Sequence, residues 1–261
     1  MTGQSVLVEK AEGVATIVLN RPDALNTMDW DLTEGLLRAA EECEVDPAVR
    51  VVIIAGAGRA FCAGGDLRGM MGSEEADPPG YLRRLTLLLH PAISCLTRMP
   101  KPVIARVQGA ASGAGMSLVL ACDLAIASQS ARFSTAYMRV ALSPDGSSTY
   151  FLPRLVGLKK ALELFFLGEA FDAAEALRLG LVNRVVPDAE LEGATLEIAR
   201  RLARGPALAM AKAKELVYRG LGESLESQME NERRAIVLCA DTDDFREGSQ
   251  AFFERREPRF G

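Results

Sequence analysis

The chain has 261 residues, of which 49% are hydrophobic, and a formal net charge of −5. This length supports one substantial core with at most a small appended unit, and the acidic balance lacks the basic footprint that nucleic-acid-binding proteins need. Five scattered cysteines without a CxxC spacing and a single histidine exclude the familiar zinc and disulfide patterns, so we expect reduced thiols and no metal site.

The N-terminal quarter of the chain predicts a hairpin, a helix and a buried strand. Alternating apolar runs at residues 6–10 and 14–19 indicate the hairpin. Residues 30–43 have a helical period, which ends at Asp46-Pro47. The apolar run at residues 49–55 is typical of a strand that is buried on both faces.

The next part of the chain predicts a loop, a helix and further alternation of strand and helix. Residues 73–80, SEEADPPG, predict either a solvated loop or a flap over a site. Residues 81–99 predict a helix that Pro91 kinks or restarts immediately after His90. Strand, helix and strand are then expected at residues 103–107, 114–121 and 123–127, a pattern that indicates mostly parallel sheet.

The second half of the chain is predicted to be almost wholly helical. Its periodic segments lie at residues 159–167, 173–179, 189–204, 206–221, 225–238 and 242–256. We expect residues 1–200 to form an α/β core and residues 201–261 a helical region with an apolar surface. Such a surface is hard to bury within one chain.

Two glycine-rich segments, residues 56–70 and 109–123, each follow a predicted buried strand. Glycine tolerates positive φ and has no Cβ, so Gly64-Gly65 and the GAG triplet at 113–115 can present backbone N–H groups to an anion at close range. Two such donors on one oxygen would form an oxyanion hole. Losing one of the two donors costs about 3 to 4 kcal/mol of transition-state stabilisation. Ordinary tight turns are the alternative, because neither segment matches a dinucleotide or P-loop motif.

The chain resembles the crotonase superfamily, also called the enoyl-CoA hydratase/isomerase family, over nearly its whole length. The motifs that carry this resemblance are NRPDALN at 20–26, FCAGGDL at 61–67, KPVIARVQGAASGAGMSL at 101–118, CDLAIAS at 122–128, PDGSSTYFLPRLVG at 144–157, EALRLGLVNRVVP at 175–187 and AFFERREPRF at 251–260. The resemblance implies an α/β fold, a crotonase-like spiral of repeated ββα units with a C-terminal helical region that trimerises. A homotrimer or dimer of trimers is therefore expected.

The resemblance also implies which residues bind the substrate, an acyl-CoA thioester. The amides of Gly65 and Ala114 would form the oxyanion hole, and Arg68 would approach CoA. Arg255, Arg256 and Arg259 in the tail either lie near the CoA phosphates or form a solvated helix end. The residues expected around CoA are Asp23, Ala24, Leu25, Ala63, Gly64, Asp66 and Arg68.

The chain departs from the hydratase pattern at two positions. Ser117 and Tyr137 stand where enoyl-CoA hydratases carry two glutamates, and unperturbed hydroxyls are not bases near neutral pH. Asp145 matches the aspartate of isomerase relatives, which moves a proton between two carbons. An Asx turn or helix cap at PDGS is the structural alternative for Asp145.

We therefore expect an enoyl-CoA double-bond isomerase with Asp145 as acid and base, Tyr137 in the acyl pocket and Ser117 orienting a water. The alternatives are a 2-enoyl-CoA hydratase, an aryl-CoA dehalogenase-like enzyme with Asp145 as nucleophile and His90 activating water, and a catalytically weak acyl-CoA-binding protein. No metal or redox cofactor is implied, since CoA enters with the substrate. The N-terminus has no export signal and no long apolar run occurs, so we expect a cytoplasmic protein without a membrane span.

Overall fold

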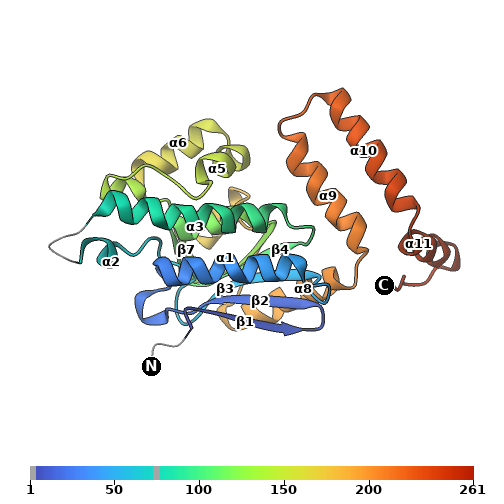
Figure 1. Cartoon of the computed structure of the whole chain (residues 1–261), viewed down its shortest axis with the longest axis horizontal. Coiled ribbons are helices and arrows are strands. Elements are labelled where there is room, and N and C mark those ends of the chain that lie inside the picture. Colours follow the sequence, from blue (N-terminus) through green and yellow to red (C-terminus); the bar gives the residue numbers. More distant parts are fainter. Residues whose placement is uncertain (1–3, 73–76) are drawn as a thin grey trace.

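A six-stranded sheet forms the centre of the protein (Figure 1). The structure, a computed structural model, describes residues 4–72 and 77–261. The first two strands pair antiparallel as the predicted hairpin, and every later pairing in this sheet is parallel. In spatial order the strands are β1 (Val6–Ala11), β2 (Val14–Leu19), β3 (Val51–Gly56), β4 (Val103–Val107), β6 (Leu124–Ser128) and β9 (Arg184–Val186).

Strand β3 is buried along its whole length, as its unbroken apolar run predicted. Successive side chains of a strand point to opposite faces, so each face of the sheet needs its own cover. Val52 and Ile54 belong to the larger core, which helices α1 (Trp30–Val45) and α3 (Pro78–Arg98) help to form. Val51 and Ile53 belong to a smaller core, which α8 (Leu191–Ala203) covers.

A second sheet of three very short strands lies beside the first. Its order is β5 (Ala110–Ser112), β7 (Arg132–Ser134) and β8 (Phe171–Asp172). An isolated parallel bridge also joins Cys62 to Ala111. The chain thus repeats a main-sheet strand, a short second-sheet segment and a helix, which confirms the predicted crotonase-like spiral of ββα units. Sequence periodicity missed these strands because two or three residues are too few to show alternation.

The helices follow the predicted pattern with two corrections. Pro78 to Gly80 were predicted as loop but form the first turn of α3, because the Asp77 side chain accepts a hydrogen bond from the Gly80 amide and Pro is tolerated at a first helical position. Residues 73–76 of that predicted loop lie outside the described residues. Of the two outcomes predicted at Pro91, a kink or a restart, the restart is wrong, because α3 continues through Pro91 as one element. The remaining helices are α2 (Leu67–Met71), α4 (Ala114–Ala121), α5 (Ser148–Val156), α6 (Leu158–Leu167), α7 (Ala173–Arg178), α9 (Ala207–Gly220), α10 (Leu225–Ala240) and α11 (Asp243–Glu254).

The last three helices extend away from the two sheets, with α11 at the end of the molecule opposite α2 (Figure 1). A buried ion pair joins α9 to the body. The Asp123 carboxylate, at the start of β6, accepts hydrogen bonds from Lys214 Nζ at 2.8 Å and Tyr218 OH at 3.0 Å. Lys214 Nζ also donates to the carbonyls of Leu96 and Lys101. In the described part of the chain, no helix is long and apolar enough to cross a membrane.

We expect Asp123→Ala to destabilise the protein by about 3 kcal/mol, because the Lys214 side chain is only 9% exposed and would lose its counter-charge. Urea denaturation followed by circular dichroism measures this loss. The double variant Asp123→Ala, Lys214→Met should lose less, since no buried charge is left unpaired. An equal or larger loss in the double variant would show that burial of an unpaired charge is not the cause.

Candidate active site

The two predicted glycine corners lie in direct contact. The first follows β3 and the second follows the β4–β5 segment, and both use positive φ: +106° at Gly64 and +52° at Gly113. A Cβ built on Gly113 would lie 3.8 Å from the Gly64 Cα, and one built on Gly64 would lie 3.8 Å from the amide nitrogen of Ala114. The residues around Gly64 and those around Ala114 are therefore neighbours, although about fifty positions separate them in the sequence.

Backbone hydrogen bonds hold these corners together. The Cys62 amide donates to the Ala110 carbonyl and the Ser112 amide donates to the Cys62 carbonyl, both at 2.9 Å. Helix α4 starts two residues after Ser112, and a Cβ on Gly115 would lie only 2.2 Å from the Cys62 carbonyl oxygen. Glycine at position 115 is thus what allows the helix to approach the first corner so closely.

Two backbone N–H groups at this contact have no hydrogen-bond acceptor among the described residues. The neighbouring amides of Ala63 and Asp66 donate to the carbonyls of Leu25 and Met28 at 3.0 Å. Within residues 4–72 and 77–261, the N–H groups of Gly65 and Ala114 donate to no protein acceptor. Ala114 is also the first residue of α4, so the positive end of the helix dipole lies there. Both amides are available to an oxygen that becomes negatively charged.

Gly65 and Ala114 border one cavity of about 410 Å³. Its remaining wall is largely apolar and comes from α2, α3 and the segment after β7. The apolar side chains that line it are Leu67, Met70, Leu82, Leu85, Leu89, Val140 and Leu142. Those of α3 were not predicted as site residues, although their spacing at 82, 85 and 89 marks one face of a helix. The cavity suits an apolar group attached to a carbonyl.

Asp145 lines the same cavity and is the only carboxylate among its described lining residues. Its Oδ1 accepts a hydrogen bond of 2.8 Å from the Tyr137 hydroxyl. The turn after Asp145 uses its main-chain carbonyl, which accepts from the Ser148 amide and hydroxyl. No side chain caps α5. The carboxylate is therefore directed to Tyr137 and the cavity, and the alternative of a side-chain helix cap is wrong.

Tyr137 connects Asp145 to a second buried hydroxyl. Ser117 Oγ lies 2.9 Å from Tyr137 OH and also contacts the carbonyls of Gly113 and Asp145. Ser117 is fully buried, and its hydroxyl already contacts Tyr137 and these two carbonyls. Because it is not among the described residues that line the cavity, it does not reach a water bound there. Burial raises the pKa of Tyr137, and the nearby Asp145 carboxylate raises it further. Tyr137 therefore stays protonated and acts as a donor rather than a base.

His90 lies on the other side of Asp145. Its Nε2 is 4.0 Å from Asp145 Oδ2, and its side chain is 55% exposed. His90 does not line the first cavity but a second one of about 310 Å³, together with Ser94, Thr97 and Ser147. The structure thus brings the predicted pair of Asp145 and His90 together, with each residue lining a different cavity.

The residues predicted around CoA lie at the first corner. Asp23 and Ala24 form a 3-10 turn, which Leu25 ends in a left-handed conformation. The buried Asn26 side chain, to which the sequence assigned no role, ties this turn to the corner through hydrogen bonds to the carbonyls of Ala57, Ala60 and Phe61.

The other predicted CoA residues have mixed positions. Ala63 and Gly64 line the cavity, whereas Arg68 is exposed on α2 and is not among the residues that line it. The Asp66 carboxylate caps α2 and pairs with Arg21 at 2.9 Å, which accounts for it structurally.

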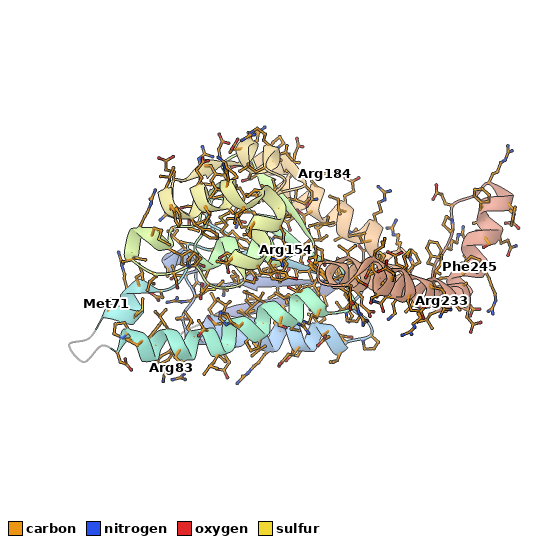
Figure 2. All side chains as sticks on the ribbon, turned by 90° about the horizontal axis from the view of Figure 1, so that it is seen from above. Met71, Arg83, Arg154, Arg184, Arg233 and Phe245 are labelled. Carbon is orange, nitrogen blue, oxygen red and sulfur yellow. The ribbon has the colours of Figure 1, made fainter. Side chains whose placement is uncertain are left out.

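The tail arginines do not reach this site within one chain. Arg256 forms ion pairs with Glu247 and Glu254, both at 2.6 Å. In Figure 2, Phe245 of α11 and Met71 of α2 lie at opposite ends of the molecule. Within one chain the tail thus lies away from this cavity, and the ion pairs of Arg256 fit the alternative of a solvated helix end. No cluster of His, Cys, Asp or Glu that could hold a metal ion occurs in the described residues.

The chain matches known proteins over its whole length. Residues 9–261 match the family model for enoyl-CoA hydratase/isomerase. A solved structure of an enoyl-CoA hydratase from Bacillus anthracis superposes with a TM-score of 0.92 at 36% identity, covering 98% of this chain and 99% of that one. The same fold and a shared sequence therefore extend through the C-terminal helices.

Curated relatives of similar identity carry three different names. A "Probable enoyl-CoA hydratase" of Rhodobacter capsulatus is 38% identical, covering 100% of this chain and 99% of the relative. A 1,2-epoxyphenylacetyl-CoA isomerase of Escherichia coli is 34% identical, covering 98% of this chain and 97% of the relative. A 4-chlorobenzoyl coenzyme A dehalogenase of an Arthrobacter species is 34% identical, covering 97% of this chain and 92% of the relative. The overall identity does not decide between hydration, isomerisation and dehalogenation.

The close approach at Gly115 generates a prediction with an internal control. Gly115→Ala should destabilise the protein by about 1 to 3 kcal/mol despite the better helix propensity of Ala, because its Cβ would meet the Cys62 carbonyl. Gly65→Ala should change stability by less than about 1 kcal/mol, since no atom lies within 4 Å of a Cβ there. Urea denaturation of both variants measures the difference. Equal stabilities would contradict the contact between α4 and the first corner.

Proposed function

This chain belongs to the enoyl-CoA hydratase/isomerase family, whose enzymes act on acyl-CoA thioesters, and we propose that it is an enoyl-CoA double-bond isomerase with Asp145 as acid and base. One observation carries the choice of isomerisation: Asp145 is the only carboxylate among the described residues that line the cavity with the amides of Gly65 and Ala114. A single carboxylate can take a proton from one carbon and return it to another, whereas hydration in the family pattern uses two.

The two amides act on the thioester carbonyl. When a proton leaves the carbon beside the carbonyl, negative charge develops on the carbonyl oxygen, and hydrogen bonds from Gly65 and Ala114 stabilise that charge. Because the amides are fixed before the reaction by the contact between the corners, little reorganisation is needed. This stabilisation is larger in the transition state than in the bound substrate and therefore accelerates the step.

Asp145 moves the proton. In a 3-enoyl thioester, the carboxylate removes a proton from C2 and the electron pair forms a dienolate whose charge rests on the carbonyl oxygen. The protonated Asp145 then delivers a proton to C4, and the product is the 2-enoyl thioester. No atom is gained or lost, so the reaction needs no co-reactant. The apolar wall from α2 and α3 would hold the hydrocarbon part of the acyl group.

Hydration is a weaker candidate although several relatives are named hydratases. Ser117 is buried behind Tyr137, and burial keeps the Tyr137 hydroxyl protonated. Neither side chain can act as the base that activates water. Asp145 would have to supply both the base and the acid for hydration by itself.

Hydrolytic dehalogenation of an aryl thioester is the second candidate, and the distance of 4.0 Å between His90 and Asp145 favours it. Asp145 would attack the ring carbon and displace the halide, and His90 would activate the water that hydrolyses the resulting aryl–enzyme ester, releasing the hydroxylated product and the Asp145 carboxylate. Against this scheme, Tyr137 donates a hydrogen bond to Oδ1, which reduces the nucleophilicity of that oxygen. A protein that binds acyl-CoA with little turnover is the remaining alternative.

We expect Asp145→Asn to lower isomerase turnover by about 10²- to 10⁴-fold, because it removes the proton-transfer group and keeps an oxygen for Tyr137. Wild type and variant are incubated with pooled 2-enoyl-, 3-enoyl- and aryl-CoA thioesters in ¹⁸O-water, and the products are analysed by mass spectrometry. Double-bond migration without ¹⁸O, lost in the variant while CoA-thioester binding survives, supports the proposal.

The other outcomes of that assay select the alternatives. Asp145-dependent entry of ¹⁸O into an aryl product supports dehalogenation. Water addition that persists in Asp145→Asn supports hydration by other groups. Binding of every thioester without any turnover supports the binding protein. Each of these results contradicts the isomerase.

We also propose that the protein is a homotrimer or a dimer of trimers. Large apolar side chains on the C-terminal helices are exposed, including Phe252 at 79% and Phe253 at 81%. They border an apolar cavity of about 430 Å³ between α9 and α11. Surfaces of this kind mark protein interfaces. A neighbouring copy that covers them would also be the source of any tail arginine near CoA.

Sedimentation analysis should therefore give three or six chain masses for the wild type. Phe252→Asp combined with Phe253→Asp should reduce this mass, because burying two carboxylates in an apolar interface is costly. Leu87→Asp, a change at an exposed apolar residue of α3, serves as the control and should keep the mass. A monomeric wild type at micromolar concentration contradicts the assembly.

A further inference from the structure

We propose that His90 exchanges the proton carried by Asp145 with solvent through the second cavity, so that the double-bond isomerisation exchanges its proton with water. This inference rests on the proposed isomerase function and adds a route for the proton. It assigns a role to the one histidine of the chain, which double-bond migration does not otherwise require.

The two oxygens of the Asp145 carboxylate have different surroundings. Oδ1 accepts the Tyr137 hydroxyl proton at 2.8 Å, and Tyr137 is itself held by Ser117 at 2.9 Å. Both hydroxyls are buried. Oδ2 instead faces His90 Nε2 at 4.0 Å. Because each hydroxyl has one proton and Tyr137 donates its own to Oδ1, the oxygen left open to receive the substrate proton is Oδ2.

Consecutive residues line the two cavities. Asp145 lines the first cavity, and the following residues, Gly146 and Ser147, line the second with His90. Gly146 has a φ of +59°, and a Cβ there would lie 3.0 Å from Ser117 Cβ and 3.4 Å from Ile93 Cδ1. The backbone thus passes tightly between α3 and α4. The Asp145 carboxylate can reach one cavity while its Oδ2 stays near the imidazole of the other.

The exchange is balanced in protons and needs no co-reactant. The proton on Oδ2 passes to Nε2 of a neutral His90, and the imidazolium releases a proton to water. The reverse sequence returns a solvent proton to Oδ2 before it is delivered to C4. The distance of 4.0 Å exceeds a direct hydrogen bond, so the half-exposed His90 side chain has to rotate toward Oδ2 for the transfer.

The experiment measures deuterium per migrated double bond. Unlabelled 3-enoyl-CoA is converted in deuterium oxide by wild type and His90→Gln, and mass spectrometry of early product gives deuterium at C4. We expect most wild-type product to carry a deuteron and this fraction to fall at least about threefold in His90→Gln. The ratio is independent of the overall rate, so a general loss of activity does not imitate the effect. Ser94→Ala, in the same cavity, should keep the wild-type ratio.

A second variant tests the relay by rescue. His90→Ala should show the low deuterium fraction, and added imidazole should raise it again with concentration, because the second cavity borders the vacated position. A deuterium fraction that is unchanged in both His90 variants overturns the inference. Wild-type migration without any deuterium overturns it as well but leaves the isomerase intact. Absence of migration in wild type overturns both, and is read directly from the unlabelled product.

Discussion

The candidate site depends on one backbone contact, the approach of the two glycine corners to each other. Hydrogen bonds between Cys62 and strand β5 fix this contact, and the missing Cβ of Gly115 lets helix α4 come close enough to complete it. As a result, the amides of Gly65 and Ala114 have no acceptor among residues 4–72 and 77–261. In the proposed mechanism, stabilisation of the oxyanion by these amides depends on packing rather than on a reactive side chain, since the donors are positioned before a substrate binds.

The chemistry of the site is then decided by the surroundings of a single carboxylate. Tyr137 and Ser117, which the resemblance aligns with the two glutamates of hydratases, form a buried hydrogen-bond chain that ends on Asp145. Burial keeps Tyr137 protonated, so this chain holds one carboxylate oxygen and contributes no base. His90 faces the other oxygen from a second cavity. The asymmetry favours proton transfer over a two-carboxylate reaction.

The C-terminal helices α9, α10 and α11 contribute none of the described residues that line the cavity of the same chain. Asp123 and Lys214 hold α9 against the body through a buried ion pair, while α10 and α11 extend away from the sheets (Figure 1). The exposed phenylalanines of α11 would be covered in the proposed trimer, and Phe245 of α11 lies at the opposite end of the molecule from Met71 of α2 (Figure 2). In the proposed trimer, a tail arginine near CoA would come from a neighbouring copy.

The sequence alone determined five of the six strands of the main sheet, most of the helices and the position of both glycine corners, because apolar periodicity and glycine conformations are local properties of the chain. It missed β9, whose three residues are too few to show alternation. It also determined the residue types at Ser117, Tyr137 and Asp145. Tertiary structure alone decided the three-stranded second sheet and the meeting of Gly65 with Ala114. It also decided that the Asp145 carboxylate accepts a hydrogen bond from the Tyr137 hydroxyl instead of capping a helix. These contacts join residues up to about fifty positions apart, and no local pattern encodes which distant surfaces pack together.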